Sequence, residues 1–267
     1  MKNKKYKMIA ADMDGTLLND ESVLTPRTKA AIIKVVESGL LFVAASGRSM
    51  RGLEMVNELF EKDMPFISFN GATVLMGKSR KVLSSKYLSF NLANEVYDIG
   101  MSREIPMILW SDSHLWASRD CKITRKYREG YGVDMKIISN MADLKDEGIF
   151  KMFWIDSKEN IQHFQIEMKA HFGEKVNCHS SRPIFLEFVS PEASKGDAMV
   201  EVGKKFGIDR SEMIAVGDGY NDISMLSYAG LGVAMGNAPD DVKAVCGHVT
   251  LSNNADGAAV VMEEYLL

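Results

Sequence analysis

The 267-residue sequence has few cysteines, no long apolar run and no excess of positive charge. Cys121, Cys178 and Cys246 are odd in number and include no close pair, which argues against both a disulfide framework and a cysteine zinc site. No apolar run reaches the ~18 residues that a membrane span requires, and the apolar stretch at 8–11 is too short for a signal peptide. These absences predict a cytoplasmic protein with reduced thiols.

The charge balance limits the possible partners. With 32 lysines and arginines against 36 aspartates and glutamates, the net charge is −4. Attraction to nucleic acid or to an anionic membrane requires clustered basic residues, so we expect neither partner. A composition of 46% hydrophobic and 25% charged residues is that of a globular protein and excludes disorder, collagen and coiled coil as the main architecture.

Short apolar runs alternate with helical patterns in the first and last thirds of the chain. This alternation predicts an α/β fold with a Rossmann-like, doubly wound parallel sheet. The first helix shows clear end signals, since Thr25 can cap it, Pro26 lies in its first turn and Gly39 follows its end. We expect strands at 8–11, 40–45, 66–69, 213–216 and 231–235, and further helices at 49–60, 194–206, 240–246 and 256–264.

The middle third has a different pattern and contains all three tryptophans. It mixes helices, expected near 91–101 and 158–172, with strands expected near 106–110 and 149–155. We therefore predict a core domain at 1–82 and 191–267 with an inserted α+β cap domain at 83–190, both of ordinary domain size. A domain tethered by two short linkers can act as a lid that closes over a site and expels water.

Acidic side chains follow two of the predicted strands. Asp12 and Asp14 come directly after the strand at 8–11, and a spacing of two places both carboxylates on one side of an extended chain. Asp218 and Asp222 follow the strand at 213–216 in a glycine-containing loop. Ligands of open α/β sheets bind beyond the carboxyl ends of strands, and Mg²⁺ accepts hard carboxylate oxygens. The two acidic strand ends therefore predict a magnesium site that can also take a phosphate.

Four short motifs give the chain a specific resemblance. The sequence DMDGTLL at 12–18, Ser46 in AASGR, Lys195 in EASKG and GDGYND at 217–222 resemble the four motifs of the haloacid dehalogenase-like hydrolases. Their order, with the insert between the second and third motifs, is similar to that of the Cof-type phosphatases of this superfamily, which carry a class IIB cap. The segments at 70–72 and 233–238 resemble the same subfamily, and the resemblance spans essentially the whole chain.

The resemblance implies a role for each acidic residue. Asp12 would attack phosphorus and form an aspartyl-phosphate, and Asp14 would protonate the leaving alcohol and then take a proton from the attacking water. The magnesium ion would be held by the carboxylates of Asp12 and Asp218 and by the backbone carbonyl of Asp14, with Asp222 as a further ligand or a close neighbour. This mechanism requires the carboxylates of Asp12, Asp14 and Asp218 to lie around one site.

The same resemblance implies the phosphate-binding residues. Ser46 and the backbone of Gly47 would donate hydrogen bonds to the phosphoryl group. Lys195 would neutralise its charge and keep Asp12 ionised, and Asn221 would orient the phosphate or a metal-bound water.

Five further residues have no role in the four motifs. Arg48 has two possible partners, the acidic site and the substrate, and Asn70-Gly71 is typical of a hairpin turn. In the cap, His179 and Arg182 are candidates for contact with the substrate.

These features predict a magnesium-dependent phosphatase for small phosphorylated metabolites, with sugar phosphates as the favoured class. A phosphomutase of the same superfamily is the first alternative, because mutases share the aspartyl-phosphate and transfer it to a second substrate hydroxyl instead of water. A dehalogenase has no use for Asp14 or for magnesium. The non-enzyme alternatives are a signalling domain phosphorylated on aspartate and a silent metabolite-binding protein, and both predict no turnover.

Overall fold

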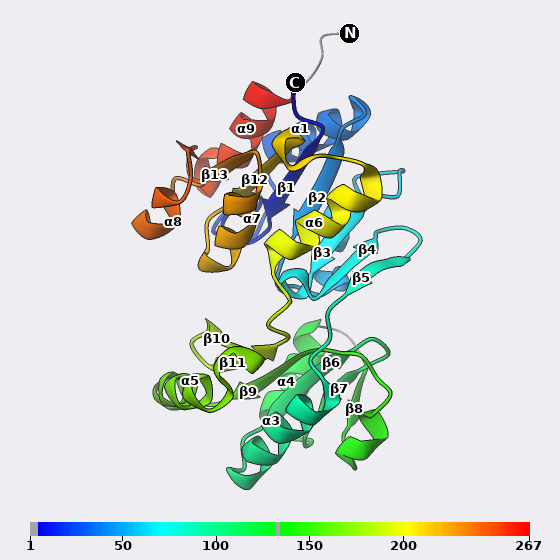
Figure 1. The fold of residues 1–267 in the computed structure, drawn as a ribbon, viewed down its shortest axis with the longest axis vertical. Helices are drawn as coiled ribbons and strands as arrows, with labels where there is room; N and C mark the ends of the chain where they lie inside the picture. Colours follow the sequence, from blue (N-terminus) through cyan, green and yellow to red (C-terminus); the bar gives the residue numbers. More distant parts are fainter. Residues whose placement is uncertain (1–4, 132–133) are drawn as a thin grey trace. The chain divides into compact units, whose positions relative to one another are not determined.

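The computed structural model describes residues 5–131 and 134–267 of the protein. The chain divides into two compact units (Figure 1). Met1–Ser85 and Ser194–Leu267 form the core unit, and Lys86–Ala193 form the inserted unit. The insert predicted from the sequence, 83–190, begins and ends three residues before the inserted unit of the structure. No helix within the described ranges is both long and apolar enough to cross a membrane.

The core unit contains an eight-stranded sheet in the order β14-β13-β12-β1-β2-β3-β4-β5. Its first six strands pair in parallel, whereas β4 and β5 are antiparallel additions at one edge. The strands are β1 (Met8–Asp12), β2 (Leu41–Ala45), β3 (Pro65–Ser68), β4 (Thr73–Met76), β5 (Val82–Ser85), β12 (Met213–Gly217), β13 (Leu231–Ala234) and β14 (His248–Val249).

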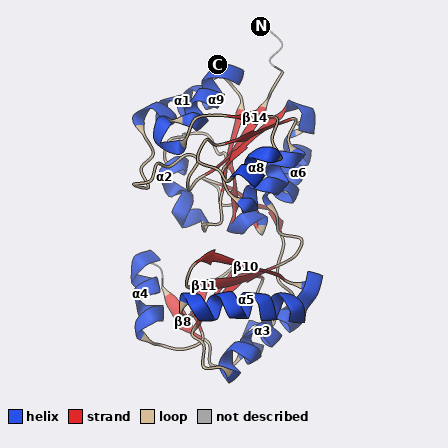
Figure 2. Ribbon diagram, turned by 90° about the vertical axis from the view of Figure 1, so that its left-hand side faces the viewer, coloured by secondary structure: helices blue, strands red, loops and turns tan. Residues whose placement is uncertain are grey.

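Helices cover both faces of the core sheet (Figure 2). Successive residues of β1 belong alternately to two apolar clusters. Ile9 and Ala11 pack with side chains of α1 and α9, whereas Met8 and Ala10 pack with side chains of α6 and α7. Every residue of β1 is buried, as expected for a central strand of a parallel sheet. The helices are α1 (Pro26–Glu37), α2 (Glu54–Asn57), α6 (Lys195–Phe206), α7 (Ile223–Tyr228), α8 (Asp240–Ala244) and α9 (Gly257–Tyr265).

Two local expectations need correction. The helix predicted at 49–60 is a 3₁₀ turn, Met50–Leu53, followed by the short α2, because Gly52 interrupts the run and glycine is a weak helix former. The sheet is also not parallel throughout. Asn70-Gly71 lies in the connection between β3 and β4, which form an antiparallel hairpin, and β5 extends it.

The inserted unit is built on a six-stranded sheet in the order β10-β11-β9-β6-β7-β8. All its neighbouring strands are antiparallel except β7 and β8. One face packs around buried Trp154 together with side chains of α3 and α5. The elements are α3 (Phe90–Ser102), β6 (Met107–Ser111), β7 (Leu115–Ala117), α4 (Lys122–Tyr131), β8 (Met135–Ile137), β9 (Ile149–Ile155), α5 (Lys158–Phe172), β10 (Asn177–Arg182) and β11 (Phe185–Val189).

Candidate active site

The predicted site residues gather at one edge of the core sheet. Asp12 ends β1, Ser46 follows β2 and Asp218 follows β12, and these three strands are neighbours in the sheet. Because the strands run in parallel, their carboxyl ends meet at the same edge. The fold therefore brings together segments that are about two hundred positions apart in sequence, as the hydrogen bond from Thr16 to Asp218 shows.

A buried lysine links two of the aspartates. The Nζ atom of Lys195 contacts Oδ1 of Asp12 and lies 2.6 Å from Oδ1 of Asp222. The side chain of Lys195 is 0% exposed, and those of Asp12 and Asp222 are 8% and 1% exposed. Lys195 is the first residue of α6, whose N-cap Ser194 accepts a hydrogen bond from the backbone of Asp197. The start of this helix thus delivers an ammonium group into the acidic site.

The second oxygen of Asp222 holds the loop that carries Asp218. Oδ2 of Asp222 accepts hydrogen bonds from the backbone N–H groups of Asp218, at 3.0 Å, and Gly219, at 2.9 Å. With Oδ1 on Lys195, both oxygens of this carboxylate already have partners. We infer that Asp222 fixes Lys195 and the loop at 217–222.

The carboxylate of Asp218 is oriented by two neighbours. Thr16 donates from Oγ1 to Oδ1 at 2.9 Å, and Asn237 lies with Nδ2 at 3.4 Å from Oδ2. Gly15 has a φ of +79°, and a Cβ on this residue would overlap the carboxylate of Asp218. A glycine in the DMDGT segment is therefore required both by the backbone conformation and by the close approach of Asp218.

Asp12, Asp218 and Asp222 form the carboxylate trio, in which one oxygen of each lies within 4.8 Å of the others. Burial raises the pKa of Asp12 to about 8, with Lys195 opposing this rise and Asp222 and Asp218 adding to it. Burial likewise raises the pKa of Asp218 to about 6, although the hydrogen bond from Thr16 opposes it. Burial lowers the pKa of Lys195, but the charges of Asp12 and Asp222 outweigh it and raise that pKa overall.

Asp14 lies outside the trio but near it, since its charge is one of those that raise the pKa of Asp218. The side chain of Asp14 is 58% exposed and binds Arg48 in a bidentate pair, in which Nε donates to Oδ2 at 2.8 Å and Nη2 contacts Oδ1. Of the two partners considered for Arg48, the structure shows the acidic one.

A second polar group gathers at the same edge of the sheet, from the segments that follow β2, β3 and β12. The buried Oγ of Ser46 accepts a hydrogen bond from the backbone N–H of Arg48 at 3.1 Å. Asn221 donates from Nδ2 to Oδ1 of Asn70 at 3.0 Å, and the Asn70 amide lies against Gly47. The sequence predicted a turn at Asn70, in a segment that resembles the Cof-type subfamily, but no part for Asn70 in the site. Its position after β3, the next parallel strand, was the signal that it belongs with Ser46 and Asp218.

The two candidates in the inserted unit lie on one polar strand, β10. His179, on β10, has Nε2 at 3.7 Å from Oε2 of Glu187, whose Oε1 accepts from the buried Lys151. Burial lowers the pKa of His179 despite the nearby carboxylate. Arg182 is exposed and lies over the ring of Phe185, with its guanidinium carbon 5.8 Å from the ring centre.

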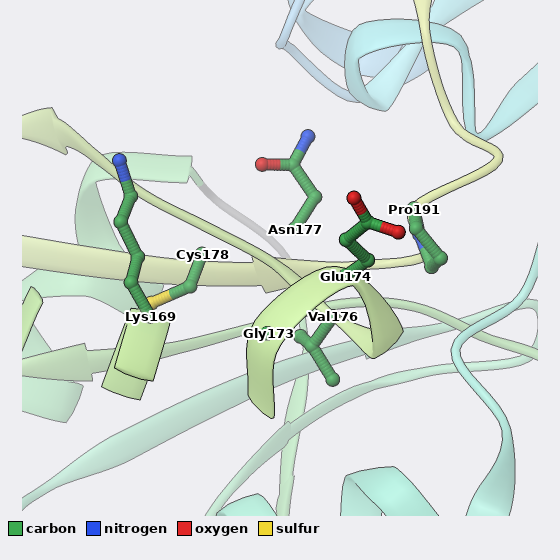
Figure 3. Close-up of a pocket in the computed structure, with 7 residues that line it drawn as sticks. All are labelled: Lys169, Gly173, Glu174, Val176, Asn177, Cys178 and Pro191. Atoms are coloured by element: carbon green, nitrogen blue, oxygen red, sulfur yellow. The ribbon is translucent and has the colours of Figure 1, made fainter. Parts of the chain in front are cut away.

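A hollow of about 420 Å³ on the inserted unit contains none of the predicted site residues (Figure 3). Its rim carries Lys169, Glu174 and Asn177, and Cys178 lies at its wall. Burial raises the pKa of the Cys178 thiol to about 12, so this cysteine stays protonated and is a poor nucleophile. The chemistry of this hollow is therefore unlike that of the acidic site on the core unit.

Residues 9–262 match the family model described as haloacid dehalogenase-like hydrolase. The chain belongs to this family. A solved haloacid dehalogenase-like hydrolase from Bacteroides thetaiotaomicron resembles it with a TM-score of 0.86 and 27% identity, over 97% of this chain and 99% of that one. The predicted α/β fold with a parallel-strand core is thus confirmed.

Curated relatives of this hydrolase are named as phosphatases. YxeH of Bacillus subtilis (strain 168), which carries a provisional phosphatase name, is 32% identical over 98% of this chain and 99% of its own length. The 5-amino-6-(5-phospho-D-ribitylamino)uracil phosphatase YwtE of the same organism is 27% identical over 97% of this chain and 98% of its own. The chain is a phosphatase of this family. Such phosphatases generally use a divalent metal ion, and the carboxylate trio is a group able to hold one.

Proposed function

We propose that this phosphatase hydrolyses small phosphorylated metabolites, with sugar phosphates as the main class, and that it uses Mg²⁺ and an aspartyl-phosphate on Asp12. The observation that carries the proposal is the buried contact of Asp12 with Lys195 beside two further carboxylates. A nucleophilic carboxylate needs a fixed orientation and a positive environment that accepts an approaching phosphate, and this arrangement supplies both.

The carboxylate trio suits a divalent cation. Three carboxylates share one buried lysine, and the raised pKa values of Asp12 and Asp218 reflect the free-energy cost of ionising them without further positive charge. Asp12 and Asp218 would hold the ion, together with the backbone carbonyl of Asp14. When bound, Mg²⁺ polarises the phosphoryl group as a Lewis acid and keeps water in its remaining positions.

The chain's own residues would carry two displacements. In the first, an oxygen of Asp12 forms a bond to phosphorus, the bond to the leaving oxygen breaks, and the carboxyl proton of Asp14 passes to that oxygen. In the second, water attacks the aspartyl-phosphate, Asp14 takes the water proton, and Asp12 leaves as a carboxylate. Because Arg48 binds both oxygens of Asp14 in this structure, one of the two contacts must open when Asp14 exchanges its proton, while the other keeps the carboxyl group oriented.

Lys195, Ser46, Gly47 and Asn221 would hold the phosphoryl group. Lys195 has three N–H donors, of which two reach Asp12 and Asp222, so the third is available to a phosphoryl oxygen. The Ser46 hydroxyl accepts from Arg48 and keeps its own proton to donate. Asn221 is exposed at the same edge of the sheet.

The substrate class rests on chemistry shared with a relative. The name of YwtE describes a phosphate ester of a ribityl chain, which is a sugar-derived polyol, and this supports polyol and sugar phosphates as the first esters to test. We propose that His179 and Arg182 select among leaving groups. Replacing each by alanine should change the ranking of substrates more than the turnover of the best one, and an unchanged ranking would remove both residues from this role.

The decisive experiment measures phosphate release from sugar phosphates, nucleotides, pyridoxal phosphate and flavin mononucleotide, with Mg²⁺ or EDTA. We expect turnover that requires Mg²⁺ and disappears in Asp12→Asn, while the matched variant Asp240→Asn, at an exposed aspartate of the core unit, stays active. Transfer of phosphate to a second sugar hydroxyl in place of release would establish a mutase. Turnover that persists in Asp12→Asn would overturn the mechanism.

A further inference from the structure

Asn70 lies at the end of the fourth strand in a row of parallel neighbours. The strands β12, β1, β2 and β3 are adjacent, and Asp218, Asp12 and Ser46 stand at the carboxyl ends of the first three. Asn70 occupies the corresponding place two residues beyond β3. Ligands of such sheets bind beyond this edge, so the topology alone places Asn70 among the residues that face a substrate.

The backbone at Asn70 is strained. Phe69, Asn70 and Gly71 have φ values of +50°, +56° and +98°, which makes three successive left-handed residues. Glycine adopts this conformation freely and asparagine tolerates it, whereas a bulky residue such as Phe69 rarely does, so the strain lies mainly at Phe69. Strain of this kind persists where the surrounding structure enforces it, and it concentrates at functional sites.

Two neighbouring loops enforce the turn. The backbone N–H of Phe69 donates to the carbonyl of Arg48 at 3.0 Å, and that of Asn70 donates to the carbonyl of Ser46 at 2.9 Å. A Cβ on Gly71 would overlap the carbonyl of Ser194, so the turn also packs against the backbone that leads into Lys195. The turn is therefore fixed to the two loops that carry Ser46 and Lys195.

The side chain of Asn70 spans the gap between two predicted phosphate-binding residues. Its amide lies against Gly47, where a Cβ would come within 3.0 Å of Oδ1 and 3.1 Å of Nδ2. Its Oδ1 accepts from Nδ2 of Asn221. Within residues 5–131 and 134–267, the hydrogen bonds of this side chain use Oδ1 alone, which leaves the two N–H donors of Nδ2 for a ligand.

We propose that Asn70 binds the phosphoryl group of the substrate directly: Nδ2 donates a hydrogen bond to a phosphoryl oxygen, while Oδ1 fixes the orientation of Asn221. The inference rests on the proposed phosphatase mechanism and adds a binding residue to it. A phosphoryl group is common to all substrates, so replacing Asn70 should change kcat/KM by the same factor for every ester. A residue that contacts the leaving group, in contrast, would affect some esters more than others.

Two variants separate this role from a structural one. Asn70→Gly removes the side chain and suits the left-handed backbone, so the protein should fold with unchanged or higher stability. Asn70→Asp keeps the acceptor for Asn221 and tolerates the turn, but places a negative charge where Nδ2 faced the phosphoryl group. Glu104→Gly is the matched control, since Glu104 is an exposed left-handed residue (φ +57°) of the inserted unit.

The experiment measures kcat/KM for several esters, the thermal midpoint, and the binding of inorganic phosphate to the Mg²⁺-loaded protein by calorimetry. We expect kcat/KM to fall about 10- to 100-fold in Asn70→Gly, further in Asn70→Asp, and by one common factor for all esters, because a hydrogen bond to a charged group is lost. Phosphate affinity should fall in the same order, and Glu104→Gly should match the wild type.

Two results would overturn the role of Asn70. One is activity and phosphate affinity within twofold of wild type in Asn70→Gly, and the other is a loss of activity that follows a lowered thermal midpoint. Failure of the proposed function looks different, because wild type itself would then release no phosphate. In that case the calorimetric titration of wild type and Asn70→Asp with inorganic phosphate still decides whether Asn70 binds a phosphoryl group.

Discussion

The ammonium group of Lys195 bridges Asp12 and Asp222 at the buried start of α6. The bridge joins the first residue of that helix to the end of β1 and to the loop after β12, so one side chain connects three segments of the core unit. Taking three charges out of water is unfavourable, and their mutual attraction offsets this only while all partners are present. The site therefore depends on Lys195 for its stability as well as for its chemistry.

Replacing Lys195 by methionine should destabilise the metal-free protein by ~3–5 kcal/mol, because two buried carboxylates lose their positive partner. Urea unfolding in EDTA at pH 8 measures this. The matched control is Lys204→Met on the same helix, where the lysine is 69% exposed and pairs with Glu201, and it should change stability by less than ~0.5 kcal/mol. Equal effects of the two substitutions would contradict the structural role of Lys195.

The pH dependence of metal binding follows from the raised pKa values in the trio. Asp218 has a pKa of about 6 against an ordinary 3.8, so its contribution to metal-free stability is full below pH 3.8 and is lost as pH rises through 6. A divalent ion binds the ionised form and must displace this proton at low pH. Because Asp12, with a pKa of about 8, would also hold the ion, we expect Mg²⁺ affinity to rise about tenfold per pH unit between pH 6 and 8 and more steeply below pH 6, where both carboxylates must lose a proton. Calorimetric titration from pH 5 to 8 tests this, and an affinity independent of pH would refute it.

The sequence predicts a site residue best when both its chemical type and its position at the end of a predicted strand indicate a role. Asp12, Ser46 and Asp218 each end a buried apolar run, so their convergence followed from the parallel topology. The pairing of Asp14 with Arg48 did not follow, because the direction of an exposed side chain depends on contacts between loops that no periodicity reports. Asn70 was assigned to its turn because Asn-Gly is a strong hairpin signal, and that signal concealed its place at the sheet edge.

The inserted unit was harder to predict for a different reason. Its long apolar segments, β9 and α5, are recognisable from their patterns. β10 has the sequence NCHSSR, which is too polar to indicate a strand by periodicity. α4 has the sequence KITRKYREGY, in which Ile123, Tyr127 and Tyr131 recur at helical spacing but most of the other residues are polar. Such segments fold because neighbouring elements supply the apolar surface, and tertiary context of this kind is absent from a local pattern.

Removing the partner of Asp14 should lower turnover without unfolding the protein. In Arg48→Ala, the carboxylate of Asp14 loses the two nitrogens that orient it, and we expect kcat to fall about 10- to 100-fold. The pair is largely exposed, so stability should change by less than ~1 kcal/mol. Arg27→Ala removes a similar bidentate pair with Glu263 on the surface and should leave kcat unchanged. The same kcat in both variants would show that Arg48 does not act through Asp14.

Asn237 should raise the affinity for Mg²⁺ through its contact with Asp218. Its Nδ2 donates to the carbonyl of Gly15 at 2.8 Å and approaches Oδ2 of Asp218, while its Oδ1 accepts from the backbone of Asn253. Groups that orient a metal ligand typically contribute 10- to 100-fold in affinity, so Asn237→Ala should weaken Mg²⁺ binding by about tenfold and lower stability by ~1–2 kcal/mol. Calorimetry and urea unfolding provide the two readouts.

The control for Asn237 is Asn254→Ala. Asn254 makes a comparable tether between the C-terminal segment and the loop after β1, donating to Asp20 at 2.8 Å and accepting from its backbone at 3.1 Å, but it contacts none of the trio. The substitution Asn254→Ala should lower the free energy of unfolding and leave Mg²⁺ affinity unchanged, because Asn254 restrains the loop at a point remote from Asp218. If both variants weaken Mg²⁺ binding equally, the effect comes from loosening the loop, and the specific contact between Asn237 and Asp218 has no part in it.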